Sequence, residues 1–234
     1  MKKSKKKFTY EFELKENPHP GFFIAFEGLD GAGNSTQASR IAKELKKRGL
    51  KVHVTKEPTS GPVGATIRLV LENRLKIDFQ TLQMMFTVDR EDHLGGERGI
   101  IKRLEKREVV ISDRYLASTL AFGFASGLDF DWLLALQSKF VLPDITYFLE
   151  VDPAICIERV RKRGTGFDLF EKKDQLEKIK EGYMRAKKVF GRKMKVVSGE
   201  GKVKNIEQEI LKNIEKTAKY KKVIKNIQQP LIKQ

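Results

Sequence analysis

Residues 22–36, FFIAFEGLDGAGNST, decide the fold. Residues 22–26 are all apolar, and a short continuous apolar run is typical of a strand that is covered on both faces. A glycine-rich segment follows, and helical spacing begins at Ser35. The pattern G-x-x-x-x-G-x-S between a strand and a helix is that of a phosphate-binding loop, since glycines let backbone N–H groups point toward phosphate oxygens. The stretch therefore predicts a phosphate site; a glycine-rich turn that holds no ligand is the alternative.

The rest of the chain alternates between short β-rich runs and longer segments with helical spacing. Further strands are expected at residues 52–55, 109–112, 145–151 and, with the weakest pattern, 194–197. Helices are expected at residues 35–48, 63–71, 79–106, 130–140, 153–162, 174–190 and 204–222. This alternation predicts an α/β protein of the P-loop NTPase type, in which three layers form from a five-stranded parallel sheet and flanking helices. Ligands of such sheets bind at the carboxyl ends of the strands.

Length and composition exclude several classes of protein. The chain has 234 residues, enough for one large domain or two small ones, and no apolar run approaches the roughly 20 residues that a membrane span needs. Residues 1–7 are followed by FTYEFELKENPHPG, where a signal peptide would have an unbroken apolar stretch. A single cysteine, Cys156, excludes an internal disulfide and a cysteine-cluster metal site. We therefore expect a reduced, cytoplasmic setting without membrane insertion.

The formal net charge of +16 is concentrated at the two ends of the chain. Residues 1–7 carry five lysines, and residues 202–234 carry nine lysines against three glutamates. We expect a basic N-terminal extension at residues 1–20, one domain at 21–225 with a mobile lid at about 161–173, and a C-terminal tail at 226–234. A nucleic-acid-binding module driven by the basic ends is an alternative hypothesis, but terminal lysine runs are usually solvated tails, so specific nucleic-acid binding is not expected.

The candidate phosphate loop departs from its motif at one position. Ser35 offers a hydroxyl to Mg²⁺, and Thr36 offers one to a phosphate. Asn34 stands where the motif has a lysine, which normally offsets the charge that develops during phosphoryl transfer. An asparagine donates a hydrogen bond but brings no positive charge. We therefore expect nucleotide binding to survive better than catalysis.

Beyond the loop, a series of motifs resembles the thymidylate kinase family. The similarity covers roughly residues 21–200 in order, which makes it more specific than any single motif. Its parts are FEGLDGAGNST, Lys56-Glu57-Pro58, Gly64 with Arg68, Phe86 to Arg90, Asp113-Arg114-Tyr115 with Ser118 and Ala121-Phe122, Pro143-Asp144, and Val151-Asp152-Pro153.

The resemblance implies transfer of the γ-phosphoryl group of ATP, with Mg²⁺, to dTMP, giving dTDP and ADP, by a homodimer. The implied ATP-binding residues are Gly28, Leu29, Asp30, Gly31, Ala32, Gly33, Asn34, Ser35 and Thr36. The implied acceptor-binding residues are Glu57, Pro58, Arg68, Phe86, Arg90, Arg114, Ser118 and Phe122. Catalytic roles fall to Asp30, Arg114, Arg161 and Arg163, and Mg²⁺ binding falls to Ser35 and Asp113.

Several of these residues also have physical interpretations of their own. Phe86 and Arg90 lie four residues apart and share one helix face. The ring can stack on a base while the guanidinium donates to the carbonyl edge of that base. The alternative is a core Phe beside a surface Arg. Arg68 and Arg114 present planar donor forks suited to a phosphate, or are ordinary surface ion pairs. Asp113 is a candidate Mg²⁺ ligand or a helix N-cap. His53 and His93 have no metal-ligand partners at useful spacing and are expected to be structural.

The lid region carries a second departure from the family pattern. Arg161 and Arg163 are candidate phosphate contacts, with stabilisation of a helix C-terminus as the alternative. Leu169 replaces an arginine that the family has in the lid, and Gly31 replaces a basic residue that some members have in the loop. We therefore predict a weakened kinase; a catalytically impaired nucleotide-binding or regulatory paralogue is the alternative. A third explanation is that Asn34 is an introduced substitution meant to trap a complex, but this would not explain the missing arginine at Leu169.

Overall fold

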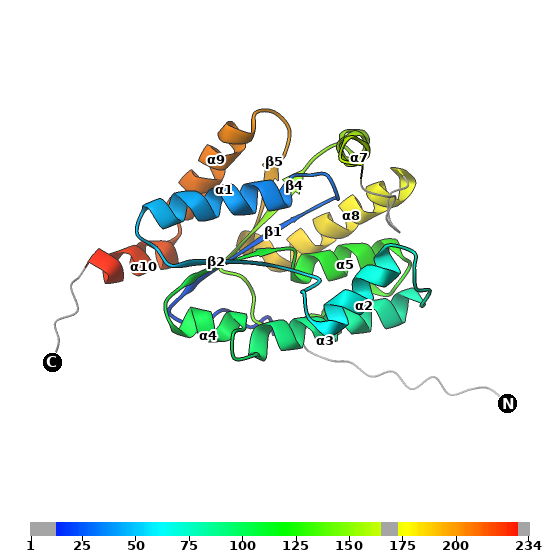
Figure 1. The fold of residues 1–234 in the computed structure, drawn as a ribbon, viewed down its shortest axis with the longest axis horizontal. Helices are drawn as coiled ribbons and strands as arrows, with labels where there is room; N and C mark the ends of the chain where they lie inside the picture. The colour runs from blue at the N-terminus through cyan, green and yellow to red at the C-terminus, as the bar shows by residue number, and fades with distance from the viewer. Residues whose placement is uncertain (1–12, 165–172, 229–234) are drawn as a thin grey trace.

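A five-stranded parallel sheet forms the centre of the molecule (Figure 1). The computed structural model describes residues 13–164 and 173–228. The strands are β1 (Phe22–Gly28), β2 (Val52–Lys56), β3 (Val109–Asp113), β4 (Ile145–Glu150) and β5 (Met194–Ser198), in the order β2-β3-β1-β4-β5. Phe26 of β1 is aligned with Asp113 of β3 and with Tyr147 of β4, so the carboxyl ends of these strands meet at one edge. The expected fold class is confirmed.

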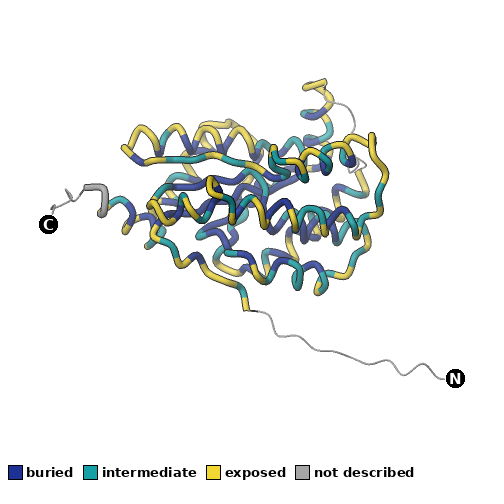
Figure 2. The backbone as a smooth tube through the Cα atoms, turned by 60° about the horizontal axis from the view of Figure 1, so that its bottom comes forward, coloured by how far each residue is buried: buried dark blue, intermediate teal, exposed yellow. Residues whose placement is uncertain are grey.

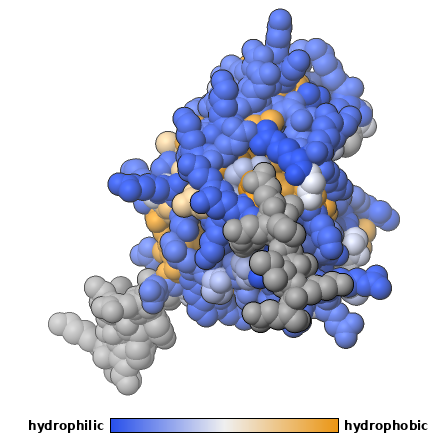
Figure 3. Space-filling view, turned by 90° about the vertical axis from the view of Figure 1, so that its left-hand side faces the viewer, coloured by the Kyte–Doolittle hydropathy of each residue, from blue (hydrophilic) through white to orange (hydrophobic). Residues whose placement is uncertain are grey.

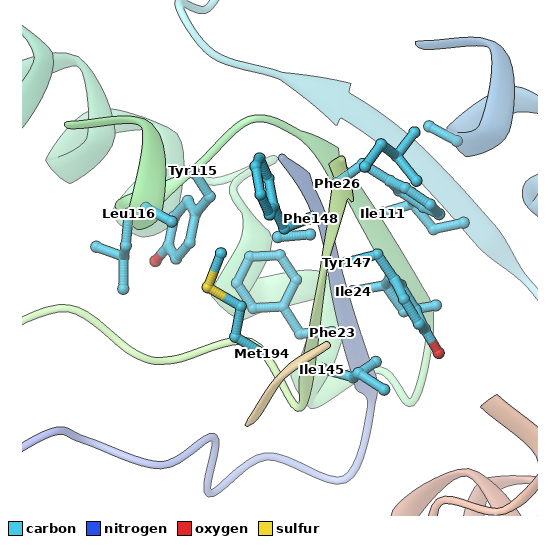
Figure 4. Close-up of a cluster of buried hydrophobic side chains, with 14 of the residues drawn as sticks. Phe23, Ile24, Phe26, Ile111, Tyr115, Leu116, Ile145, Tyr147, Phe148 and Met194 are labelled. Carbon is cyan, nitrogen blue, oxygen red and sulfur yellow. The ribbon is translucent and has the colours of Figure 1, made fainter. Parts of the chain in front are cut away.

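Strand β1 is buried along its whole length and supplies both halves of the core (Figures 2 and 4). Successive side chains of a strand point to opposite faces of the sheet. On one face the Phe23 ring packs edge-on against Tyr115, with 5.0 Å between ring centroids. On the other face Phe26 stacks on Tyr147 at 5.6 Å. Burial on both faces explains why this strand reads as an unbroken apolar run.

Helices cover both faces of the sheet (Figure 1). Helices α1 (Asn34–Lys47) and α9 (Val203–Glu215) pack together on one face, and α5 (Leu116–Ala125) and α8 (Lys173–Phe190) pack together on the other. Outside α5 lie α2 (Pro62–Leu71), α3 (Phe79–Gly95) and α6 (Phe130–Gln137). The remaining elements are α4 (Ile100–Glu105), α7 (Pro153–Lys162), α10 (Ala218–Gln228) and a 3₁₀ turn at Gly191–Lys193.

Two of the expected helices are each divided into two, and one helix was not expected. The helix expected over residues 79–106 is two helices, because the chain turns at Gly96–Gly99, where a Cβ on Gly99 would lie 2.6 Å from the Leu94 carbonyl oxygen. The helix expected over residues 204–222 also breaks, between α9 and α10. Helix α5 was not expected, because its sequence LASTLAFGFA is apolar almost throughout and has no polar face. Its tight packing on α8 explains this composition, since a Cβ on Gly182 would lie 2.6 Å from the Ala121 Cα.

Residues 13–20 of the basic extension are hydrogen-bonded to the domain at the amino ends of the strands. The Lys15 carbonyl accepts a hydrogen bond from the Leu142 amide at 2.7 Å. Asn17 donates to the Asp144 carboxylate at 2.8 Å, and Lys219 of α10 donates to the Asn17 carbonyl at 2.7 Å. Burial raises the pKa of Asp144 although Lys219 lies beside it. These residues tie the amino-terminal segment to α10.

The side of the molecule that carries α10 is largely hydrophilic (Figure 3). Lys221, Lys222 and Lys225 of α10 are exposed there. Within the described residues, no helix combines the length and apolar character required to cross a membrane.

Candidate active site

The loop between β1 and α1 forms a cavity of about 230 Å³ at the carboxyl edge of the sheet. Gly31 and Gly33 have φ angles of +90° and +103°, which favour glycine. A Cβ on Gly31 would lie 2.5 Å from the Cys156 carbonyl oxygen, so this loop has no room for a basic side chain at that position. The first N–H groups of α1 have no intrahelical acceptors and carry the positive end of the helix dipole, so the cavity favours an anion. It is lined by Leu29, Asp30, Gly31, Gly33, Asn34, Ser35, Thr36, Asp113, Arg114, Val160 and Arg163.

The Asn34 side chain is engaged inside the loop itself. The hydrogen-bonding groups around it orient the amide so that its nitrogen donates to the Glu27 carbonyl at 3.1 Å and its oxygen accepts from the Gly28 amide at 3.2 Å. Only 6% of the residue is exposed. Asn34 therefore links the start of α1 to the end of β1 and adds no positive charge to the cavity.

Ser35 and Asp113 meet at the mouth of this cavity. The Ser35 hydroxyl donates to the Asp113 carboxylate, which β3 places beside the loop. Asp113 is not the N-cap of the following helix, because that position is occupied by Tyr115. The described residues contain no cluster of three or more His, Cys, Asp or Glu side chains that could hold a metal. A hydroxyl and one carboxylate suit Mg²⁺, which keeps several waters and takes its other ligands from substrate phosphates.

A second cavity, of about 180 Å³, lies beside the first and brings together seven of the eight residues implied for the acceptor. Arg68 does not line it; this side chain donates instead to the carbonyls of Pro58, at 3.3 Å, and Thr59. It thereby supports the loop after β2. The cavity is lined by Asp30, Glu57, Pro58, Leu71, Gln83, Phe86, Arg90, Arg114, Tyr115, Ser118, Thr119 and Phe122.

Arg90 is a buried residue and not the surface arginine of the alternative interpretation. It is 1% exposed, and its Nε and Nη2 atoms donate to one Glu57 oxygen at 3.0 and 2.5 Å. Its remaining N–H groups donate to Thr119, Gln137 and the Tyr115 carbonyl. Burial works to raise the pKa of Glu57, but Arg90 and His93 outweigh burial, so this pKa lies below its usual value. The pair is therefore ionised and holds α3 against the end of β2.

Asp30 and Arg114 line both cavities and mark the point where they meet. Arg114 pairs with the Asp30 carboxylate and donates to the Gly28 carbonyl at 2.8 Å and to the Tyr183 hydroxyl at 3.1 Å. Its backbone φ of 70° is unusual for a residue with a side chain and directs the chain out of β3. Burial works to lower the pKa of Arg114, but Asp30, Tyr183, Asp113 and Glu27 together outweigh burial, so the pKa is raised. A permanent positive charge is thus fixed between the cavities.

The described part of the lid contributes one arginine to the loop cavity. Arg163 follows α7 and lines the cavity, and its Nε lies 3.4 Å from the Arg159 carbonyl that accepts its hydrogen bond. Arg161 lies in the last turn of α7. Leu169 and the rest of the expected lid between residues 165 and 172 lie outside the described residues.

Comparison with known proteins decides the family. A sequence model of the thymidylate kinase family matches residues 26–210. The chain belongs to the thymidylate kinase family. It is 37% identical over 202 residues to a probable thymidylate kinase of Thermococcus kodakarensis, covering 82% of this chain and 97% of the relative. A probable thymidylate kinase of Pyrobaculum aerophilum is also 37% identical, over 165 residues, covering 69% of this chain and 81% of that protein.

The fold likewise matches a solved thymidylate kinase. The structure of the Candida albicans enzyme superposes with a TM-score of 0.74 at 25% identity, covering 86% of this chain and 93% of that chain. The Candida protein is described as having broad substrate specificity. The similarity to thymidylate kinases therefore includes the sheet and the residues that line the two cavities.

Three residues of this thymidylate kinase fold take part in the site but were missed in the sequence. Glu27, at the end of β1, accepts hydrogen bonds from the Tyr115 amide (2.9 Å) and the Ser118 hydroxyl (2.5 Å). Burial raises its pKa, and Ser118 and Arg114 do not cancel the effect. Tyr183 of α8 donates to the Gly28 carbonyl at 3.1 Å, and Arg159 of α7 donates to the Gly31 carbonyl at 3.3 Å. A carboxylate within an apolar strand was a signal for Glu27, whereas nothing local in the sequence marks Tyr183 or Arg159.

Proposed function

We propose that the protein transfers the γ-phosphoryl group of MgATP to dTMP, giving dTDP and ADP. One observation carries this proposal: the phosphate-type loop cavity and the cavity lined by the implied acceptor residues meet at Asp30 and Arg114. Phosphoryl transfer needs two substrates held in line and a positive charge near the transferred group. The family membership supports the assignment of dTMP as acceptor.

The loop residues fit MgATP except at Asn34. The loop requires a glycine at position 31, because a Cβ there would meet the Cys156 backbone. The N–H groups at the start of α1 would hold the phosphates. Ser35 and Asp113 would hold Mg²⁺, which neutralises charge on the phosphates when bound. Asn34 supplies no charge, so Arg163 and Arg161 are the candidates to approach the phosphates from the lid. We accordingly propose slower turnover than a lysine at this position would give; the alternative is an impaired nucleotide-binding or regulatory paralogue.

The acceptor cavity supplies an apolar wall and a cationic end. Phe86 and Phe122 provide aromatic surface for a base, and Arg90 supports Glu57 and the loop after β2. Arg114 would hold the acceptor phosphate toward the loop cavity, and Asp30 is proposed to contact the sugar. Ser118 lies next to Arg114, with its hydroxyl 3.2 Å from the Nη1 atom. Arg68 would act indirectly on the acceptor, by supporting the loop after β2.

The proposal is tested by ADP production with a panel of acceptors: dTMP, dUMP, UMP and dCMP. We expect saturable ADP production with dTMP and a lower kcat/KM with UMP. Better activity on UMP than on dTMP would overturn the assignment of the acceptor. ADP production that does not depend on any nucleoside monophosphate would overturn the assignment of the reaction.

We also propose that the protein is a homodimer, as the resemblance implies, and that α2 and α3 form its interface. Helix α3 exposes apolar side chains beside α2, since Met84 is 41% and Val88 56% exposed. A shallow apolar cavity beside them is lined by Pro62, Val63, Thr66, Thr81, Met84, Met85 and Val88. A second copy of the chain would cover this surface, since apolar burial drives most association between proteins.

Val88→Asp should therefore convert a dimer into a monomer at micromolar concentration, because it buries a charge at the centre of the interface. The measurement is the molar mass by size-exclusion chromatography with light scattering. Val203→Asp is the matched control, since Val203 is 42% exposed on α9, away from this surface. An unchanged mass for Val88→Asp, or an equal loss for the control, would contradict this interface.

A further inference from the structure

A basic surface surrounds the point where the carboxyl end of α1 meets α10 (Figures 1 and 3). Arg48, which follows α1, pairs with Glu215 at 2.7 Å and donates to the Tyr220 hydroxyl at 3.3 Å, so the two helices are neighbours there. Helix α1 begins at the phosphate loop and has 14 residues, which places its other end about 20 Å from the loop cavity. The exposed lysines around this point, which we call the α1–α10 surface, are Lys43, Lys46, Lys47, Lys51, Lys216, Lys221, Lys222 and Lys225.

Most of the charge of the α1–α10 surface is not neutralised within the protein. The segments that form it contain the acidic residues Glu44 and Glu215, and these pair with Lys47 and Arg48. The other lysines of the surface form no ion pair with any residue that the structure describes. Cations gathered without counter-charges create a positive potential, which attracts a polyanion over the length of a Debye screening distance.

A groove of about 610 Å³ between α1 and the edge strand β2 belongs to this surface. It is lined by the apolar side chains of Ala42 and Val54, by Ser39, and by Lys43, Lys46 and Lys47. Val54 is 41% exposed, so the apolar part of the groove is open to a partner. A sugar–phosphate chain combines apolar sugar carbons with regularly spaced anions, and the groove offers a matching contact for each.

The composition of the α1–α10 surface favours a double-stranded nucleic acid over other polyanions. Single strands are usually held by stacking on aromatic rings, and none of the exposed large hydrophobic side chains among the described residues is aromatic. An anionic membrane would require an exposed apolar helix face, but Tyr220 and Val223 of α10 are buried against the domain. A duplex carries about one negative charge per 1.7 Å along its axis, which lysines can match without reading bases.

We propose that the α1–α10 surface binds the phosphate backbone of double-stranded nucleic acid without sequence preference. Lysines supply the contacts, and they are point charges with no fixed geometry for a base edge. None of them lines either cavity, so the duplex and the substrates occupy separate places on the molecule. The protein would thereby hold its nucleotide site close to nucleic acid while both cavities stay open.

The test measures binding of a short fluorescently labelled DNA duplex of mixed sequence to the full chain by anisotropy, at two salt concentrations. The surface variant carries Lys46→Gln, Lys221→Gln and Lys222→Gln. A matched control carries Lys76→Gln, Lys178→Gln and Lys188→Gln, at exposed positions outside this surface. A second control carries Lys5→Gln, Lys6→Gln and Lys7→Gln. All three variants lose the same amount of charge.

The surface variant should bind the duplex at least about tenfold more weakly than the wild type at about 50 mM salt. Its plot of log affinity against log salt should be shallower by about 2–3, because each lost phosphate contact removes about 0.9 from the slope. Both controls should bind within about threefold of the wild type. All variants should unfold at the wild-type temperature, and MgATP at constant ionic strength should not displace the duplex.

Equal weakening in the matched control would show attraction by net charge alone and overturn the proposal. Weakening in the second control but not in the surface variant would assign binding to the N-terminal lysines and overturn it as well. Displacement by MgATP would place the duplex in the phosphate cavity instead. Tighter binding of a single strand, or of vesicles that contain anionic lipid, would contradict the choice of a duplex.

Discussion

Arg114→Gln should lower kcat by about 10²–10³, the usual effect of removing one well-placed charged donor from a transfer site. Arg114 lines both cavities and is fixed by Asp30 and the Gly28 carbonyl, so its charge is already in place before substrates bind. Glutamine keeps a donor but removes this charge and the planar fork that suits a phosphate. The measurement is kcat for ADP release at saturating MgATP and dTMP.

Two controls make this result specific to the site. Arg74→Gln removes a charge from a side chain that is 70% exposed and should leave kcat unchanged. Thermal unfolding of Arg114→Gln should show a folded protein, although Asp30 loses its partner. A kcat within about threefold of the wild type would show that Arg114 does not stabilise the transferred group.

Asn34→Lys should raise turnover at least about tenfold, because it supplies the cation that the loop lacks. The Asn34 amide now bridges the Glu27 carbonyl and the Gly28 amide, and a lysine would give up this link to reach the phosphates. We expect the gain in charge stabilisation to exceed the loss of the bridge, since hydrogen bonds of this neutral type contribute only about 1 kcal/mol each. Steady-state ADP production with dTMP measures the change.

Asn34→Met separates the charge from the bridge, because it removes the amide without adding a cation. It should leave turnover equal to or below that of the wild type. A Lys variant no faster than the Met variant would mean that the loop does not lack a cation, and that lid residues already supply it. A rise in turnover with Lys alone would show that the missing charge at Asn34 limits the rate.

The parts of the fold that follow from local pattern were predictable. The run at residues 22–26 predicted a central strand, and β1 is buried throughout because helices cover both of its faces. The glycines predicted the loop, and the positive φ angles at Gly31 and Gly33 give the physical reason. By contrast, α5 has no polar face, so its helical period could not be seen until its burial against α8 was known.

The site was predictable where residue type alone suggests chemistry and less so where partners decide the role. Ser35 and Asp113 meet as expected, although they are far apart in the sequence. Arg90 lines the acceptor cavity, but its hydrogen bonds to Glu57 and to groups from α5 and α6 could not be predicted from its spacing on α3.

The net charge of +16 bears little on this site. Exposed lysines of α10 lie on the hydrophilic side of the molecule, while the loop cavity is lined by two arginines, Arg114 and Arg163. The position of a few cations relative to the phosphates matters more for transfer than the total charge of the chain. The replacement of the loop lysine by Asn34 is therefore the more informative feature.

The central claim, that this protein phosphorylates dTMP, is tested most directly by measuring dTDP formation from dTMP and MgATP beside a titration of nucleotide binding. We expect dTDP to form together with an equal amount of ADP, at a rate that saturates with dTMP and falls in Arg114→Gln. Tight binding of nucleotide with no dTDP above the uncatalysed background would contradict the claim and would identify the chain as a nucleotide-binding paralogue.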